Sequence, residues 1–228
     1  MKRTIGISLS LFLFSQTVSA QQPPLQIWFD QPAAQWEEAL PLGNGRLGMT
    51  PDGGIEKEKI VLNDITLWSG SPQDANNYEA YKQLPAIRKL LSEGKNDEAQ
   101  KLIDKSFICL GPGSGGAQWG CFQMLADLNI TYRYTGAAAT AHDYRRWLSL
   151  DSAIATTSFT IDGVRYTREY FTSFGDDVDL IRISASEKGK LNFSVGISRP
   201  ERGESSISGQ ALLLAGQLHN GTDGKGMQ

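Results

Sequence analysis

Apolar and polar residues alternate with a period of two along much of the second half of the chain. This alternation is typical of a β-strand that buries one face and exposes the other. Repeated antiparallel strands of this kind, separated by turns, favour a β-sandwich. The segments that show the pattern are residues 128–134, 159–170, 178–183 and 191–197, and residues 206–218 supply a further candidate strand.

A tight β-hairpin is predicted inside the second of these segments. Ile161 is followed by Asp162-Gly163 and then by Val164, so an Asp-Gly pair separates two apolar runs. Asp-Gly fits the positive φ angles of a type I′ turn, which matches the twist of the flanking strands. The two halves of the segment should therefore pair with each other.

Residues 78–106 follow a helical pattern instead. Pro85 can occupy the first turn of a helix, and Gly94 is placed to end it. Asn96 can then cap a second helix. The residues expected on the inner faces are Ile87, Leu90 and Leu91 in the first helix and Ala99, Leu102 and Ile103 in the second.

The segment before this hairpin, residues 25–75, is dense in Gly, Asn, Asp and Trp between short apolar runs. That composition predicts short strands joined by tight loops. The fold class expected for residues 21–228 is therefore mainly β: one large antiparallel β-sandwich with an inserted helical hairpin.

The first twenty residues read as a secretory signal peptide. Lys2 and Arg3 give a charged start, residues 5–14 form a short apolar run, and Ala20 supplies a cleavage site. The alternative is an N-terminal membrane anchor, for which the run is short. The mature chain is expected to begin near Gln21 and to be periplasmic or secreted, with no membrane attachment after processing.

Composition narrows the classes of partner. The formal net charge is −3, so the basic face of a nucleic-acid-binding protein is not expected. The chain contains 2 histidines and 2 cysteines, which does not favour a His/Cys zinc site of the usual spacing. No metal site and no cofactor are predicted.

The two cysteines flank a Gly-rich stretch. An oxidising compartment permits a disulfide between Cys109 and Cys121. Such a bridge over a short loop would add about 3 kcal/mol in the chain-entropy model. Two separate thiols are the alternative, because spacing alone does not fix the Cα geometry.

Two segments concentrate residues that could contact a ligand. In the first, from Gly43 to Gly48, three glycines allow the backbone to approach another backbone or a ligand closely, and Asn44 and Arg46 present polar groups. A β-turn with a solvated Arg is the simpler alternative. The second segment contains Asn63, Asp64 and Trp68. Amide and carboxylate groups can bind sugar hydroxyls, and an indole can pack on a pyranose. The alternative, a strand end with a core Trp, is the commoner case for any single Trp.

A third candidate, Gln123, follows the Gly-rich stretch on a segment that could border a ligand cleft or form a loop tip.

No arrangement of residues typical of a catalytic nucleophile is evident. Glycoside hydrolysis needs two carboxyl groups held across the scissile bond, and the sequence designates no such pair among its 25 Asp and Glu residues. Asp176-Asp177 is assigned to a solvated turn.

Taken in order, the motifs resemble the N-terminal domain of glycoside hydrolase family 95, over residues 25–228. The resemblance rests on Ile27-Trp28-Phe29, the run from Trp36 to Gly48, the run from Leu62 to Gly70, the helical hairpin, Gln123 to Leu128, Tyr144 to Asp151, and Tyr166 to Phe171.

This resemblance implies a β-sandwich packed against an (α/α)6 barrel that carries a Glu acid and an Asp base. The family hydrolyses α-L-fucosides, often α-1,2-linked, with inversion. None of the barrel residues lies in this chain, so no catalytic residue is assigned. The resemblance implies an inactive N-terminal fragment of a secreted α-L-fucosidase that meets fucosylated plant or host glycans through the full-length enzyme.

Two alternatives remain. One is an α-L-galactosidase of the same family, because the two sugars differ mainly at C5. The other is a stand-alone carbohydrate-binding β-sandwich. The last residues, 223–228, read as a turn followed by the start of a strand, which is expected of a chain cut before its C-terminal barrel.

Overall fold

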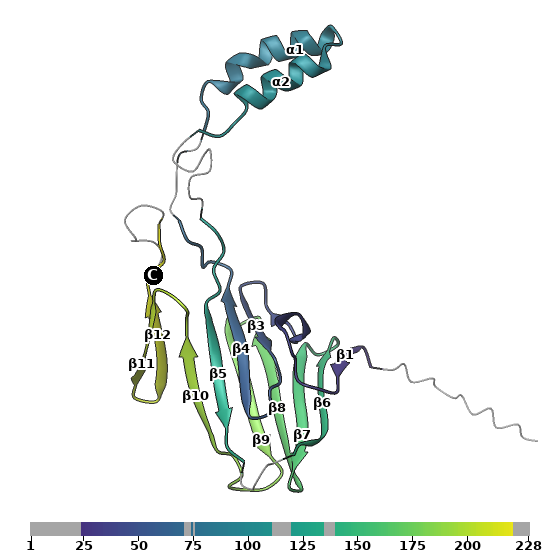
Figure 1. Ribbon diagram of the computed structural model, residues 1–228, viewed down its shortest axis with the longest axis vertical. Helices are drawn as coiled ribbons and strands as arrows, with labels where there is room; N and C mark the ends of the chain where they lie inside the picture. The colour runs from purple at the N-terminus through teal and green to yellow at the C-terminus, as the bar shows by residue number, and fades with distance from the viewer. Residues whose placement is uncertain (1–23, 71–73, 75, 111–119, 135–139, 221–228) are drawn as a thin grey trace, which may run out of the picture.

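The structure is a computed structural model that describes residues 24–70, 74, 76–110, 120–134 and 140–220. The signal peptide expected over residues 1–20 lies outside these ranges. Within them the chain is mainly β, as the alternation predicted, with strands gathered into two five-stranded antiparallel sheets and a separate hairpin (Figure 1). No helix in the described ranges is long and apolar enough to cross a membrane.

The first sheet combines one early strand with four consecutive strands from the second half of the chain. Its order is β1 (Gln26–Phe29), β6 (His142–Ser149), β7 (Ile154–Ile161), β8 (Val164–Ser173) and β9 (Val178–Ala185). β7 and β8 form the expected hairpin. Asp162 and Gly163 have φ angles of 50° and 78°, so the positive φ values of a type I′ turn are confirmed.

The second sheet combines the early strands with two later ones. Its order is β10 (Phe193–Ser198), β5 (Ala126–Tyr132), β4 (Lys57–Asp64), β3 (Leu47–Pro51) and β2 (Leu42–Gly43). The single strand expected over residues 206–218 is in fact a hairpin, β11 (Gly203–Ser208) and β12 (Ala211–Gly216). Gly209, with a φ angle of 60°, allows the reversal that the sequence pattern did not reveal.

The hydrophobic core lies between the two five-stranded sheets, which is the arrangement of a β-sandwich. Its buried residues come from both sheets: Met49, Ile60, Ile130 and Tyr132 from one, and Leu148, Ala155 and Tyr170 from the other, with Leu40 beside them. A short 3-10 helix, η1 (Trp36–Glu38), precedes the second sheet.

The helical hairpin is confirmed between β4 and β5. It consists of a 3-10 turn, η2 (Ala80–Gln83), and the helices α1 (Leu84–Ser92) and α2 (Asn96–Ser106). Gly94 reverses the chain with a φ angle of 73°. The expected cap is wrong: Lys95 holds the N-cap position without a side-chain bond, and Asn96 is the first residue of the helix.

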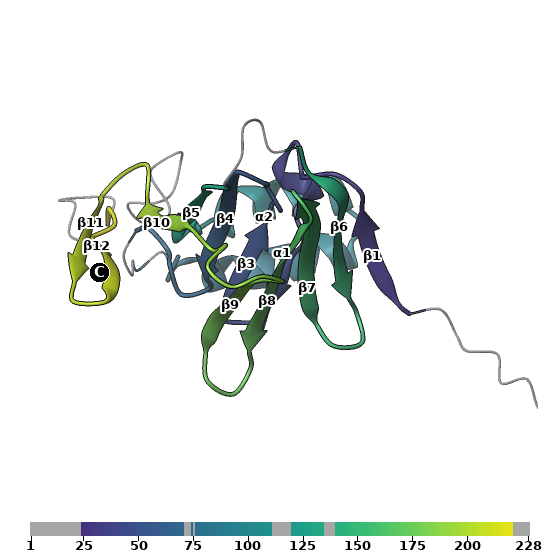
Figure 2. The same ribbon diagram turned by 90° about the horizontal axis from the view of Figure 1, so that it is seen from below.

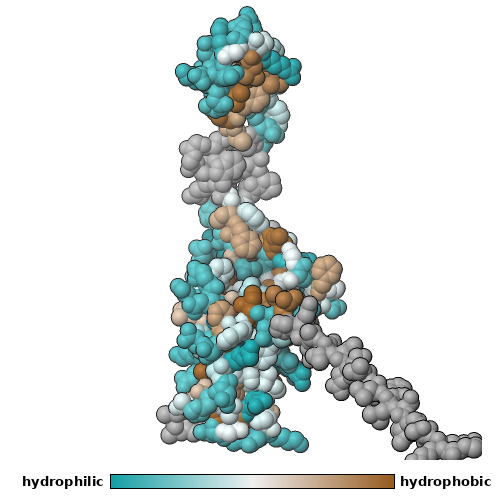
Figure 3. Space-filling view, turned by 90° about the vertical axis from the view of Figure 1, so that its right-hand side faces the viewer, coloured by the Kyte–Doolittle hydropathy of each residue, from teal (hydrophilic) through white to brown (hydrophobic). Residues whose placement is uncertain are grey.

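The hairpin stands beyond the end of the two sheets (Figure 1). Ile87 and Ala99 are buried between its helices, as the periodicity predicted. Leu91 was expected on the same inner face but is 50% exposed. Two antiparallel helices bury only a narrow stripe of each other, so the remaining apolar side chains of the hairpin gather on one side of its surface (Figure 3).

Candidate functional site

The first candidate segment is a turn that joins β2 to β3 and is closed by one side chain. Asn44 Oδ1 accepts hydrogen bonds from the backbone N–H groups of Arg46 at 2.9 Å and Leu47 at 2.8 Å. Gly45 supplies the positive φ angle of 93° that this reversal requires. The sequence therefore needs Asn and Gly here to form the turn itself.

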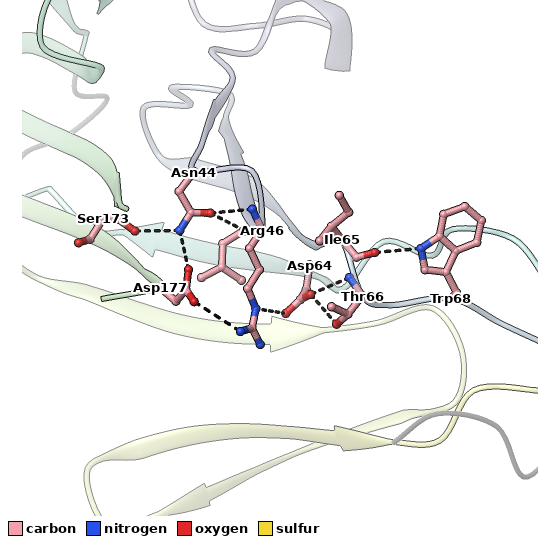
Figure 4. Close-up of polar contacts among 9 residues, drawn as sticks. Asn44, Arg46, Asp64, Ile65, Thr66, Trp68, Ser173 and Asp177 are labelled. Carbon is pink, nitrogen blue, oxygen red and sulfur yellow. Dashed lines mark hydrogen bonds and ion pairs between the residues drawn. The ribbon is translucent and has the colours of Figure 1, made fainter. Parts of the chain in front are cut away.

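The same asparagine connects this turn to the opposite sheet. Its Nδ2 donates to the backbone oxygen of Ser173 at 2.8 Å and to Asp177 Oδ1 at 2.9 Å. Ser173 ends β8, and Asp177 lies on the turn between β8 and β9. Asn44 thus ties the end of one sheet to the end of the other (Figure 4).

Arg46 lies between two carboxylates at this end of the sandwich. Its Nη1 is 3.4 Å from Asp177 Oδ2, and its Nε is 3.7 Å from Asp64 Oδ2. The Arg46 side chain is 56% exposed, so these pairs contribute little to stability. They place the guanidinium between the Asp64 and Asp177 carboxylates (Figure 4).

The second candidate segment begins with a turn organised by Asp64. Its Oδ1 accepts from Thr66 Oγ1 at 2.7 Å and from the Thr66 backbone N–H at 2.9 Å. The Thr66 hydroxyl, followed by the backbone bond and by Arg46, lowers the pKa of Asp64 below its usual value of 3.8. Asp64 is therefore a fixed carboxylate at neutral pH.

Trp68 lies farther along this loop and is half exposed. Its Nε1 donates to the backbone oxygen of Ile65 at 2.9 Å. Its ring meets Phe122 edge to face, with centroids 6.0 Å apart. Trp68 and Phe122 are 50% and 42% exposed, so together they present an aromatic surface next to the Asp64 turn.

Gln123 belongs to the segment that pairs with this loop. Its backbone N–H donates to Leu67 O at 2.9 Å, and its side-chain Oε1 accepts from Arg199 Nη2 at 3.1 Å. Its Nε2 lies 3.0 Å from the sulfur of Cys121. Gln123 therefore positions neighbouring residues as well as facing a groove.

Two adjoining grooves open at this end of the molecule. One has a volume of about 340 Å³ and lies between the Asp64 loop and the β11–β12 hairpin; the other, of about 450 Å³, continues past Gln123. Polar residues on their walls are Arg46, Asp64, Thr66, Arg199 and Arg202 in the first and Ser69, Gln123, Glu201, Arg202 and His219 in the second.

The structure thus brings five of the six candidate residues to one end of the sandwich. Arg46 and Asp64 line the first groove, Gln123 lines the second, and Asn44 and Trp68 lie beside them. Asn63 is different: it faces Gly48 across the β3–β4 ladder, where a Cβ on that glycine would lie 3.9 Å from Asn63 Cβ. Its side chain is half-buried there.

Sequence reasoning missed the later residues of this site. Asp177 was assigned to a solvated turn, and it does lie on a turn, but its carboxylate meets both Asn44 and Arg46. Arg199 and Arg202 enter the groove walls from the segment between β10 and β11. Pairing of distant segments brings them here, and no local motif marks them.

The two cysteines are both exposed. Cys121 accepts a backbone bond from Ser69 at 2.9 Å, and its sulfur lies 3.5 Å from Ser69 Oγ. Residues 111–119 between the two cysteines lie outside the described ranges. A disulfide between Cys109 and Cys121 stays a prediction.

A second group of ionisable residues lies in the core, away from the grooves. Arg168 Nη1 is 3.1 Å from Glu58 Oε2, and both side chains are almost completely buried. Tyr132 and Tyr170 donate their hydroxyl hydrogens to the same carboxylate. Burial raises the pKa of Glu58, against the opposing effect of Arg168. This network is closed to a substrate and supports the fold.

The described residues contain no cluster of His, Cys, Asp and Glu that could hold a metal ion.

A family model described as the N-terminal domain of glycosyl hydrolase family 65 matches residues 27–228. The chain belongs to this family. The match confirms the resemblance found in the sequence: the chain is an N-terminal domain of the type shared by glycoside hydrolase families 65 and 95.

Curated relatives of this family 65 domain include three named α-fucosidases. α-L-fucosidase 2 of Arabidopsis thaliana is 35% identical over 172 residues, 75% of this chain and 20% of the relative. Probable α-fucosidase A of Aspergillus niger is 31% identical over 213 residues, 85% of this chain and 25% of the relative. The chain thus spans about a fifth to a quarter of these relatives. The Aspergillus oryzae protein of the same name is 30% identical over 157 residues.

Proposed function

We propose that this chain is the N-terminal domain of a secreted α-L-fucosidase that removes terminal, often α-1,2-linked, fucose from glycans with inversion. The observation that carries the proposal is the family match over residues 27–228, together with three relatives named α-fucosidases. The domain contributes to substrate binding, and the chemistry is done by polypeptide outside residues 1–228.

Two ionisable carboxyl groups, Asp64 and Glu58, fit this division of labour, because neither is suited to act as the catalytic acid. Inverting hydrolysis needs an acid and a base roughly 6.5–9.5 Å apart, and the acid needs a raised pKa. Asp64 lines a groove, but its hydrogen bonds lower its pKa, so it is a poor proton donor. Glu58 has a raised pKa but is enclosed in the core. Neither has both the access and the ionisation that a catalytic acid requires.

The function is tested on the gene product that includes whatever sequence follows residue 228. Incubation with 2′-fucosyllactose, followed by proton NMR, should show free L-fucose released first as the β-anomer, because inversion reverses the α-configuration. A parallel incubation with an α-L-galactoside should give much slower release. Faster release of L-galactose would identify an α-L-galactosidase. Binding of the glycan without any release would identify a carbohydrate-binding module.

We further propose that the grooved end of the sandwich borders the substrate cleft, with Arg46 and Trp68 as contributors. Trp68 supports this role because half of its surface remains exposed although its Nε1 is anchored. In the active gene product, Trp68→Ala should raise KM or lower kcat with little change in Tm. Trp36→Ala, on η1 and 61% exposed, is the matched control. A lowered Tm with normal kinetics would assign Trp68 to structure alone.

Export is the remaining part of the proposal. The charged start, the short apolar run and Ala20 support cleavage of the first twenty residues. Mass spectrometry of the protein from the periplasm or medium should find a start near Gln21. Recovery of an intact Met1 in the membrane fraction would contradict it.

A further inference from the structure

The inward face of β10 is only partly covered. Its register with β5 places Phe193 opposite Tyr132 and Val195 opposite Ile130. Directly opposed residues on antiparallel strands project from the same face of the sheet. Tyr132 and Ile130 are 6% and 3% exposed because this face forms the core, yet Phe193 and Val195 are 39% and 45% exposed.

The opposite sheet ends too early to cover these side chains. β9 is its last strand, and β3 of the second sheet already packs against β8 and β9. In the view from below, β5 and β10 of the second sheet lie beyond β9, the last strand of the first sheet (Figure 2). The core positions of β10 therefore face a place where the first sheet has no strand among the described residues.

The outer edge of β9 is suited to receive one. β9 pairs with β8 over eight consecutive positions without a bulge, and it pairs with no other strand in the described ranges. Ile181 and Ile183 on its inner face already pack against the core. A regular strand with one unpaired edge presents a row of backbone donors and acceptors for a further strand.

We propose that a β-strand from the polypeptide that follows Gln228 adds to the free edge of β9 and covers Phe193 and Val195. The inference rests on the proposed function, because it needs the longer protein. The curated relatives are four to five times as long as their matched segments, which leaves ample chain to supply this strand. Its inward side chains are apolar, to match β10.

A second copy of the chain fits this surface less well. Phe193, Val195 and their neighbour Ile197 together expose no more than a few hundred Å² of apolar surface. A stable protein–protein interface buries about 800 Å² per partner. A strand continuous with the domain needs less area, since it loses less translational freedom on binding.

The test uses thiol labelling in a Cys109→Ser, Cys121→Ser background. Val195→Cys places a thiol on the inward face of β10, and Ser194→Cys places one on the outward face of the same strand, where Ser194 is exposed. In residues 21–228 both thiols should react with maleimide at similar rates. In the longer gene product, labelling at Val195→Cys should slow by at least about tenfold while Ser194→Cys stays unchanged.

Three outcomes would overturn the proposal. Equal labelling of Val195→Cys in both proteins would leave the β10 face open, and slowing at both positions would mean that a whole domain covers β10. Protection in residues 21–228 that grows with protein concentration would identify a second copy as the occupant. Fucose release from the same longer sample is measured separately, so failure of the strand and failure of the enzymatic function are distinguishable.

Discussion

Asn44 and Asp177 are joined by a 2.9 Å hydrogen bond across 133 positions of sequence. One lies on the turn between β2 and β3, and the other on the turn between β8 and β9, so the bond links the ends of the two sheets. Arg46 Nη1 donates to the other carboxylate oxygen of Asp177, Oδ2, at 3.4 Å. The geometry of the grooved end therefore depends on a contact between two turns that are remote in sequence.

Removal of this contact should loosen that end of the sandwich. Asn44→Ala deletes two bonds accepted from backbone N–H groups and two bonds donated to Ser173 and Asp177. We expect the free energy of unfolding to fall by about 1–3 kcal/mol, because a partly buried turn loses its partners. Urea denaturation measures the change.

Asn129→Ala is the matched control for this variant. Asn129 is exposed, and its Nδ2 makes two longer bonds of 3.3 Å, to Asp127 O and Ser198 Oγ. Its removal should change stability by less than about 0.5 kcal/mol. Equal effects of the two substitutions would show that Asn44 has no special role in joining the sheets.

The buried ion pair of Glu58 and Arg168 should be far more important than a surface pair. Arg168→Met leaves the Glu58 carboxylate in the core without its cation, at a cost of about 3–5 kcal/mol. Arg182→Met breaks the pair with Glu169, in which the arginine is 78% exposed, at a cost of less than about 1 kcal/mol.

Thermal unfolding of the two methionine variants gives the comparison. Arg168 also stacks on the ring of Tyr132, with its guanidinium carbon 3.6 Å from the centroid, so the loss includes packing. A similar Tm for the Arg168→Met and Arg182→Met proteins would mean that the core does not depend on the charge of Arg168.

Asp64 should contribute a pH-dependent stability. Its pKa in the folded state lies below the usual 3.8, so its stabilising effect is present above about pH 3.8 and is lost as the pH falls through the folded value. Thr66→Val removes the hydroxyl that lowers the pKa most. The midpoint of the Asp64 titration, followed by carboxyl carbon NMR, should move upward.

The Asp64 midpoint in Thr66→Val should still lie below 3.8, because the Thr66 backbone N–H and Arg46 remain. Arg46→Met is the comparison, and it should shift the midpoint less, since Arg46 has the smaller influence on the pKa. A larger shift in Arg46→Met than in Thr66→Val would show that charge, and not the hydroxyl, controls Asp64.

Local patterns were enough to predict much of the fold. The alternation of residues marked strands, and Asp162-Gly163 marked a turn, because both signals depend only on neighbours along the chain. Glu58, which stands between two lysines in the sequence, carries no such local signal. Its side chain is buried because Arg168, Tyr132 and Tyr170 from other strands surround it.

The sequence marked candidate residues of the site as far as Gln123 but none after it. Asn44, Arg46 and Asp64 stood out because Gly, Asn and Asp cluster in short segments. Asp177 and Arg199 belong to the site through pairing of distant strands, which a single sequence does not encode locally. Asn63 precedes Asp64 on β4, and successive strand residues point to opposite faces, so its place in the cleft stays a prediction.

The central claim is that residues 21–228 form a domain that serves an α-L-fucosidase without performing the chemistry. The most direct measurement compares free fucose released from 2′-fucosyllactose by purified residues 21–228 and by the longer gene product under identical conditions. We expect release from the longer protein and none from residues 21–228. Turnover by residues 21–228 that survives further purification, and disappears on substitution of one of their own carboxylates, would contradict the claim.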